Sequence, residues 1–126
     1  MIRRALMALF AVMTPSQVLA ADWALVATSS NDVRQYLDVG SVSRNGDDRS
    51  IWVKEIDPKT AAHGEAYSVL HWRYDCSART GTLLSWMQYR ANGTLIDSEQ
   101  IPSYKQSAID LAPDTVGERM LNTVCG

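Results

Sequence analysis

Short runs of β-branched and aromatic residues, separated by turn residues, dominate the chain after residue 22. Such runs predict antiparallel strands rather than alternating strand and helix units. Asn45-Gly46 and Asn92-Gly93 tolerate the positive φ angles of tight turns, so each marks a hairpin. Residues 59–64 are expected to form an exposed loop. The predicted strands number about six, at residues 23–27, 33–39, 51–56, 66–76, 82–91 and 94–99.

The two longest strand runs, at residues 66–76 and 82–91, predict a central hairpin joined by the short link 77–81. Side chains alternate between the two faces of a strand. One face of the first run carries an apolar set and is expected to face the core. That set is Leu70, Trp72, Tyr74 and Cys76, and the opposite set is Tyr67, Val69, His71, Arg73 and Asp75.

Helical periodicity replaces the strand pattern at residues 115–124, with Thr115 and Glu118 forming a capping-box signature. The apolar side of this helix is Val116, Met120, Leu121, Val124 and Cys125. Cys125 therefore lies on the side that faces the sheet, and Cys76 lies on the core face of its strand. We expect an α+β fold, a single antiparallel sheet with a C-terminal helix packed on it and tethered by a disulfide between Cys76 and Cys125.

The N-terminus has the composition of a secretory leader. Arg3 and Arg4 precede an apolar run at residues 5–13, and Val18-Leu19-Ala20 offers a small-residue cleavage site. The apolar run is too short to span a membrane, which needs about 20 such residues. We expect residues 1–20 to be a signal peptide and residues 21–126 to be one exported domain, periplasmic or extracellular, with no stable membrane insertion.

Charge narrows the class of partner. The 126 residues carry 12 Lys and Arg and 14 Asp and Glu, a formal net charge of −2. Loss of Arg3 and Arg4 with the leader would make the mature domain more acidic still. A mildly acidic domain without a basic cluster is a poor candidate for binding nucleic acid, which demands concentrated Lys and Arg.

Structural roles explain the reactive side chains of this chain better than catalysis or metal binding does. Cys76 could act as a nucleophile with His63 or His71 as its base, but a structural disulfide explains the cysteine pair better. Two histidines in the whole chain argue against zinc. The carboxylate pairs Asp47-Asp48 and Asp97 with Glu99 are better explained as a solvated turn and an edge-strand charge pair. We therefore expect no catalytic residue, metal or cofactor.

The aromatic residues remain as candidates for partner binding. Four Trp and five Tyr against one Phe is an amphipathic selection that suits partly wet surfaces. Tyr67, His71 and Arg73 are expected on the sheet face away from the helix. Tyr and Arg are common anchors of protein interfaces, so these three residues are the candidate contacts for a partner, or for a second copy of the chain.

Several short motifs are spread over nearly the whole mature part. They are Tyr36-Leu37-Asp38 with Ser41, the strand containing Trp52, Tyr67-Ser68, Asp75-Cys76, Tyr89 with Gly93, Ala112-Pro113-Asp114 and Val124-Cys125. Together these motifs resemble the bacterial surface-adhesin protein E family. The resemblance implies an antiparallel sheet with a disulfide-tethered C-terminal helix, binding to host matrix or plasma proteins, and a dimer.

The sequence thus predicts an exported, non-enzymatic binding module whose partner is a protein, recognised by a sheet face and loops. Two alternatives stay open. One is a periplasmic structural or envelope accessory protein, and the other is a carrier of a small ligand. A shared fold does not by itself transfer function, so the three hypotheses need different tests.

Overall fold

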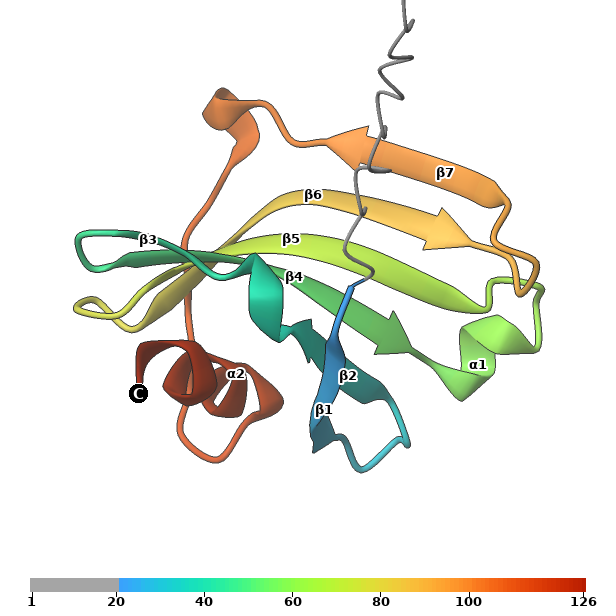
Figure 1. The fold of residues 1–126 in the computed structure, drawn as a ribbon, viewed down its shortest axis with the longest axis horizontal. Coiled ribbons are helices and arrows are strands. Elements are labelled where there is room, and N and C mark those ends of the chain that lie inside the picture. Colours follow the sequence, from blue (N-terminus) through green and yellow to red (C-terminus); the bar gives the residue numbers. More distant parts are fainter. Residues whose placement is uncertain (1–20) are drawn as a thin grey trace, which may run out of the picture.

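An eight-stranded antiparallel sheet forms the body of the protein in a computed structural model, which describes residues 21–126 (Figure 1). Six strands follow one another in the order β1-β2-β4-β5-β6-β7, while β3 pairs with β4 and β8 pairs with β6. The predicted signal peptide, residues 1–20, lies outside the described residues. The strands are β1 (Trp23–Thr28), β2 (Arg34–Asp38), β3 (Ser43–Asn45), β4 (Asp48–Ile56), β5 (Tyr67–Asp75), β6 (Thr80–Tyr89), β7 (Leu95–Gln100) and β8 (Ile109–Asp110).

The six main strands confirm the strand prediction, and four short elements add to it. These elements are β3, β8 and the 3₁₀ turns η1 (Val39–Ser41) and η2 (Ser103–Lys105). The expected loop at residues 59–64 is partly helical, because α1 covers Pro58–Ala61. Asp57 caps this turn by accepting a hydrogen bond from the Lys59 amide at 2.9 Å. Pro58 suits the first helical position, where no amide donor is needed.

The predicted central hairpin consists of β5 and β6, which pair from Tyr67 with Tyr89 to Asp75 with Thr80. Its turn is held by Asp75, whose carboxylate accepts the amides of Ser77 and Ala78, both at 2.9 Å. The register shifts between His71 and Trp72 on β5, so a bulge bends the hairpin near its middle.

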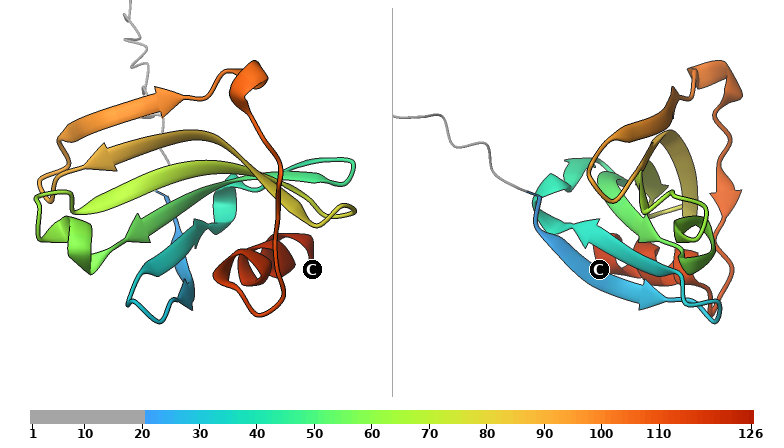
Figure 2. Two further views of the ribbon diagram at one scale, coloured as in Figure 1. Left: turned by 180° about the vertical axis from the view of Figure 1, so that it is seen from behind. Right: turned by 90° about the vertical axis from the view of Figure 1, so that its right-hand side faces the viewer.

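The C-terminal helix α2 (Val116–Cys125) begins at the predicted cap, where the Thr115 hydroxyl accepts the Glu118 amide at 3.2 Å. Its apolar side is buried through Met120, Leu121 and Val124. Figure 2 shows the segment between β7 and α2 passing along the side of the sheet on which the helix lies. Both features confirm the predicted packing of a C-terminal helix on the sheet.

The core lies between α2 and the sheet. Leu37, Ile51, Val53 and Tyr74 supply the sheet side, each at most 3% exposed. Cys76, directly after β5, forms a disulfide with Cys125 in the last turn of α2, with their Cα atoms 5.7 Å apart. The predicted tether is therefore present, and it joins the helix end to the central hairpin. We call the sheet face opposite α2 the outer face.

Candidate functional site

The outer face carries the three predicted partner-binding residues together with aromatic and polar neighbours. Strand alternation and register place them there, because Ile51 and Val53 of β4 point into the core and their neighbours point away. No helix among residues 21–126 has its buried residues turned to this face. The outer-face residues of the three central strands include Ser50, Trp52, Lys54, Tyr67, Val69, His71, Arg73, Thr82, Ser85, Met87 and Tyr89.

His71 stacks on Trp52. The two residues are cross-strand partners on β4 and β5, and their ring centroids lie 4.4 Å apart with planes inclined by 8°. Desolvation by burial holds the pKa of His71 below its usual value, so the neutral imidazole is favoured. The two stacked rings lie side by side at the middle of the outer face.

A second aromatic pair lies farther along β5 and joins it to β6. Tyr67 stacks on Tyr89, its partner on β6, with centroids 5.1 Å apart, and the ammonium of Lys54 lies 4.5 Å from the centroid of the Tyr67 ring. The Tyr89 hydroxyl donates to the sulfur of Met87 at 3.3 Å. These contacts restrain side chains that a binding partner would otherwise have to order.

Arg73 lies beyond His71 on β5, between Ser50 of β4 and Thr82 of β6. Thr82 is 6% exposed, so the sheet is closely packed around the base of the arginine. The structure therefore places Tyr67, His71 and Arg73 in one row on one face. No hydrogen bond, ion pair or ring stack joins any two of these three residues.

A shallow hollow adjoins the Trp52 and His71 stack toward the edge strand β7. It has a volume of about 130 Å³, and its lining includes Trp52, Ser85, Met87, Ser98 and Gln100. Its wall combines aromatic rings, a thioether, hydroxyls, an amide and the carboxylate of Glu99. This part of the outer face can contact both apolar and hydrogen-bonding groups.

Sequence reasoning missed Trp52, Lys54 and Tyr89 as members of this site. Alternation along β4 could have placed Trp52 and Lys54 on a common face. The pairing of each with a residue on β5 depends on strand register, which hydrophobic pattern and turn geometry specify only together.

Other candidates fall outside a functional site. Both cysteines are in the disulfide, so the hypothesis of a catalytic Cys76 is wrong. Within residues 21–126 no three His, Cys, Asp or Glu side chains come close enough to share a metal ion. Asp97 and Glu99 are exposed on β7, the last strand of the sheet path. That position agrees with their predicted role on an edge strand.

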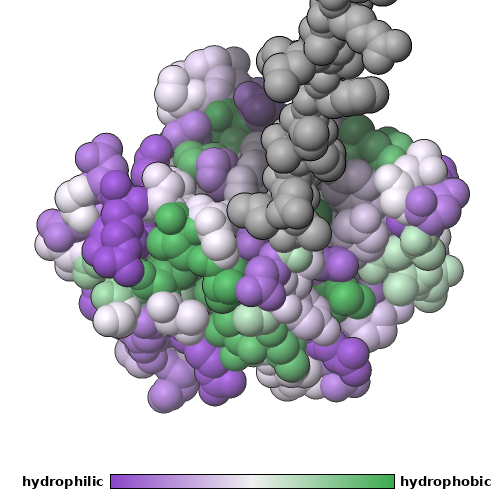
Figure 3. Space-filling view, in the orientation of Figure 1, coloured by the Kyte–Doolittle hydropathy of each residue, from purple (hydrophilic) through white to green (hydrophobic). Residues whose placement is uncertain are grey.

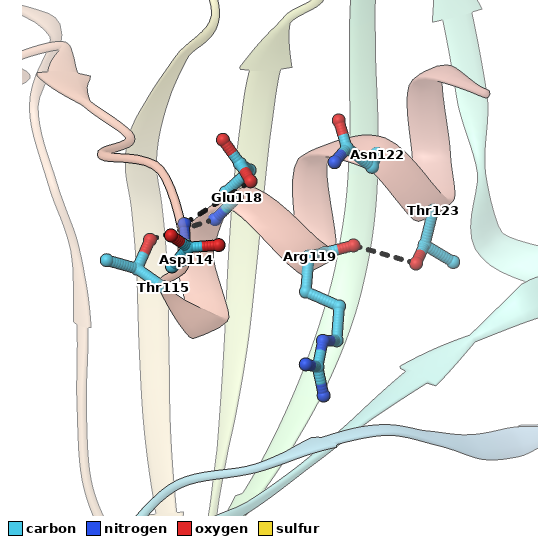
Figure 4. A pocket seen from close by; sticks show the side chains of 6 residues that line it. All are labelled: Asp114, Thr115, Glu118, Arg119, Asn122 and Thr123. Carbon is cyan, nitrogen blue, oxygen red and sulfur yellow. Dashed lines mark hydrogen bonds between the residues drawn. The ribbon is translucent and has the colours of Figure 1, made fainter.

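A polar depression of about 310 Å³ lies on the exposed side of α2 (Figure 4). Its side chains are already used in local contacts. Thr115 caps the helix, Glu118 forms an ion pair with Arg79 at 3.6 Å, and Thr123 donates to the Arg119 carbonyl at 2.8 Å. We assign this depression to helix capping and not to ligand binding.

Apolar side chains also reach the surface near one edge of the sheet. Figure 3 shows hydrophobic residues gathered over β1 and η1, where Leu25 and Val39 are 56% and 49% exposed.

Among the described residues, no helix is long and apolar enough to cross a membrane.

Comparisons with known proteins address the family. A family model described as surface-adhesin protein E matches residues 23–126. A comparison with curated protein sequences finds no match. Among solved structures, protein E of Haemophilus influenzae aligns at 15% identity with a TM-score of 0.59 and covers 88% of each chain.

Two further structures of the same kind agree with that fold. Crystal form II of Haemophilus influenzae protein E aligns at 13% identity with a TM-score of 0.59, covering 88% of this chain and 91% of the other. Protein E from non-typeable Haemophilus influenzae aligns at 14% identity with a TM-score of 0.54, covering 88% and 79%. Since the family model spans nearly all of the described residues, this chain belongs to the surface-adhesin protein E family.

Proposed function

We propose that this chain is an exported, non-enzymatic binding module that recognises a protein partner through the outer face and its adjoining loops. Membership of the surface-adhesin protein E family supports an adhesin-like role. The observation that carries the proposal is the row of preorganised aromatic and basic side chains on a sheet face that no described helix covers.

The chemistry of the outer face suits a protein partner. Aromatic side chains bury a large area while losing few rotamers, and stacked rings have already lost part of that freedom. Trp52, Tyr67 and Tyr89 are such residues. Lys54 and Arg73 add positive charge to a chain whose net charge is −2, so the preferred partner surface carries carboxylates.

The cellular location of the protein decides which partners it can bind. An exported module displayed outside the cell would bind host matrix or plasma proteins, whereas one retained in the periplasm would act as an envelope accessory protein. Protease treatment of intact cells separates the two. Cleavage of the protein on intact cells supports adhesion. Complete protection until the cells are lysed would exclude the hypothesis that this chain is an adhesin.

A matched pair of tyrosine substitutions tests the binding surface. Tyr67 and Tyr104 each lie beneath a lysine ammonium, with Lys54 at 4.5 Å and Lys105 at 5.9 Å from the ring centroid. Tyr104 lies in η2, away from the outer face, and is 83% exposed. Tyr67→Ala removes an outer-face anchor, while Tyr104→Ala removes a similar side chain elsewhere.

Binding of the purified mature domain is measured against a panel of immobilised matrix and plasma proteins. For any protein that binds, Tyr67→Ala should weaken the affinity at least about tenfold, the effect of an anchor worth 1.4 kcal/mol or more. Tyr104→Ala should leave it unchanged. Circular dichroism checks that both variants fold. Equal affinities for the wild type and Tyr67→Ala would place the binding surface somewhere other than the outer face.

A further inference from the structure

A cavity of about 220 Å³ lies on the helix side of the sheet, and its walls come from β2, β4, β5, α2 and the segment at residues 109–111. Leu70 and Trp72 of β5 line the sheet side, and Val116 and Met120 of α2 line the helix side. Leu111, in the segment between β8 and α2, closes the cavity. An apolar cavity of ~150 Å³ is large enough to hold benzene. This cavity therefore has room for an aromatic ring with a short substituent.

The frame of the cavity is held in place by backbone contacts. The Leu111 amide donates to the Arg79 carbonyl at 3.3 Å, which fixes the segment that closes the cavity. A Cβ atom at Gly117 would lie 3.0 Å from Leu111 Cδ2, so the glycine lets α2 and this segment approach closely. Ile109 also lines the cavity and is 49% exposed, which places it at the opening to solvent.

One charged group stands among these apolar walls. Glu55 of β4 lines the cavity, and its carboxylate accepts a hydrogen bond from the Gln35 side-chain amide at 2.9 Å. Burial raises the pKa of Glu55, and the nearby charges of Asp57 and Glu65 raise it further. Within residues 21–126 a side-chain ion pair joins Arg79 to Glu118, and Glu55 takes part in no ion pair. The carboxylate is thus partly desolvated, repelled by its neighbours and not balanced by a protein cation.

We propose that this cavity binds a small organic cation, with an ammonium group at Glu55 and an aromatic or aliphatic body between Trp72, Leu111 and Met120. Charge complementarity selects the ligand class, because an ammonium supplies the opposite charge and a hydrogen-bond donor that the site lacks. The indole of Trp72 adds a surface on which an aromatic body can stack or a cation can rest. This site lies on the opposite face from the proposed protein-binding surface and does not depend on it.

Benzylammonium is the probe, and benzyl alcohol is its uncharged counterpart of similar shape. Binding to the mature domain is followed by NMR through the indole N–H of Trp72 and the methyl group of Met120. Benzylammonium should shift both resonances in a saturable manner and should bind at least tenfold more tightly than benzyl alcohol. Benzoate, which carries the wrong charge, should cause no saturable shift.

Variants locate the charge and the opening. Glu55→Gln keeps the shape and the bond to Gln35, and it should weaken benzylammonium at least tenfold while leaving benzyl alcohol unaffected. Ile109→Trp, at the exposed rim, should weaken both probes. Glu99→Gln removes a carboxylate from exposed β7 and serves as the matched control, with no expected effect.

Three outcomes would overturn the proposal. These are equal affinity for benzylammonium and benzyl alcohol, equal loss of affinity from Glu55→Gln and Glu99→Gln, and saturable shifts confined to Trp52 on the outer face. Thermal unfolding of each variant shows whether it is folded. Because the probes do not involve the outer face, failure here leaves the protein-binding test standing, and failure of that test leaves this one standing.

Discussion

Replacing both Cys76 and Cys125 with alanine should lower the free energy of unfolding by about 4 kcal/mol. The disulfide closes a loop with a sequence separation of 49 residues. In the chain-entropy relation, a loop of that size restricts the unfolded chain by ~14 cal/mol/K, which is about 4 kcal/mol at 25 °C. The whole stability of a domain of this size is ~5–15 kcal/mol, so the disulfide is a large share of it.

The same loss can be expressed as a change in melting temperature. Unfolding entropies average ~2.1 cal/mol/K per residue, or about 0.2 kcal/mol/K for the described part of the chain. A loss of about 4 kcal/mol then lowers Tm by ~18 °C. The native structure should survive at 25 °C, because Met120, Leu121 and Val124 still bury the apolar side of α2.

Urea unfolding followed by circular dichroism and tryptophan fluorescence measures this loss. The dependence on urea should become steeper in the alanine variant, because an unfolded chain without the cross-link exposes more surface. Wild-type protein reduced with dithiothreitol is the control and should show the same loss. A loss below about 1 kcal/mol would refute the entropic account. Selective loss of helical signal before global unfolding would show that the disulfide, and not the apolar side, holds α2 on the sheet.

Three further predictions concern the core and two titrating groups. Leu121→Ala should cost about 3 kcal/mol in urea unfolding, since Leu121 is fully buried and leaves a cavity; a loss under 1 kcal/mol would mean the site collapses freely. Glu55→Gln should raise Tm at pH 7. Because the pKa of Glu55 is raised, ionisation of its carboxyl group lowers the stability of the folded protein as the pH rises above 4.5, and glutamine does not ionise. The gain should vanish below that pH, and a gain independent of pH would contradict this cause. His71 has a lowered pKa, so the wild type should lose stability relative to His71→Gln as the pH falls below 6.5, and parallel pH profiles of the two proteins would exclude the effect.

Local patterns predicted the long elements of this fold well. The β5 run alternates over nine residues, and the helix run has a capped start and an apolar side, so each carries its own signal. β3 and β8 have three and two residues, too few for a period to show. Such short strands form because a longer neighbour offers hydrogen-bond partners, and that neighbour is known only once the chain has folded.

The candidate site shows the same division between local and non-local information. Alternation along β5 was enough to place Tyr67, His71 and Arg73 on one face. It could not identify Trp52 as the partner of His71, because that contact depends on the register between β4 and β5. A shift of one residue would bring a core side chain of β4 opposite His71 instead.

The sequence by itself determined the fold class of this protein. Strand alternation and helical periodicity are patterns among neighbouring residues, and with only two cysteines a single disulfide pairing is possible. Tertiary structure alone decided the rest. The aromatic stacks require two strands in register, and the cavity at Glu55 requires β4, the segment at Leu111 and the helix at Gly117 to meet. These groups are far apart in the chain, and their distances are set by the packing of the whole core rather than by any local pattern.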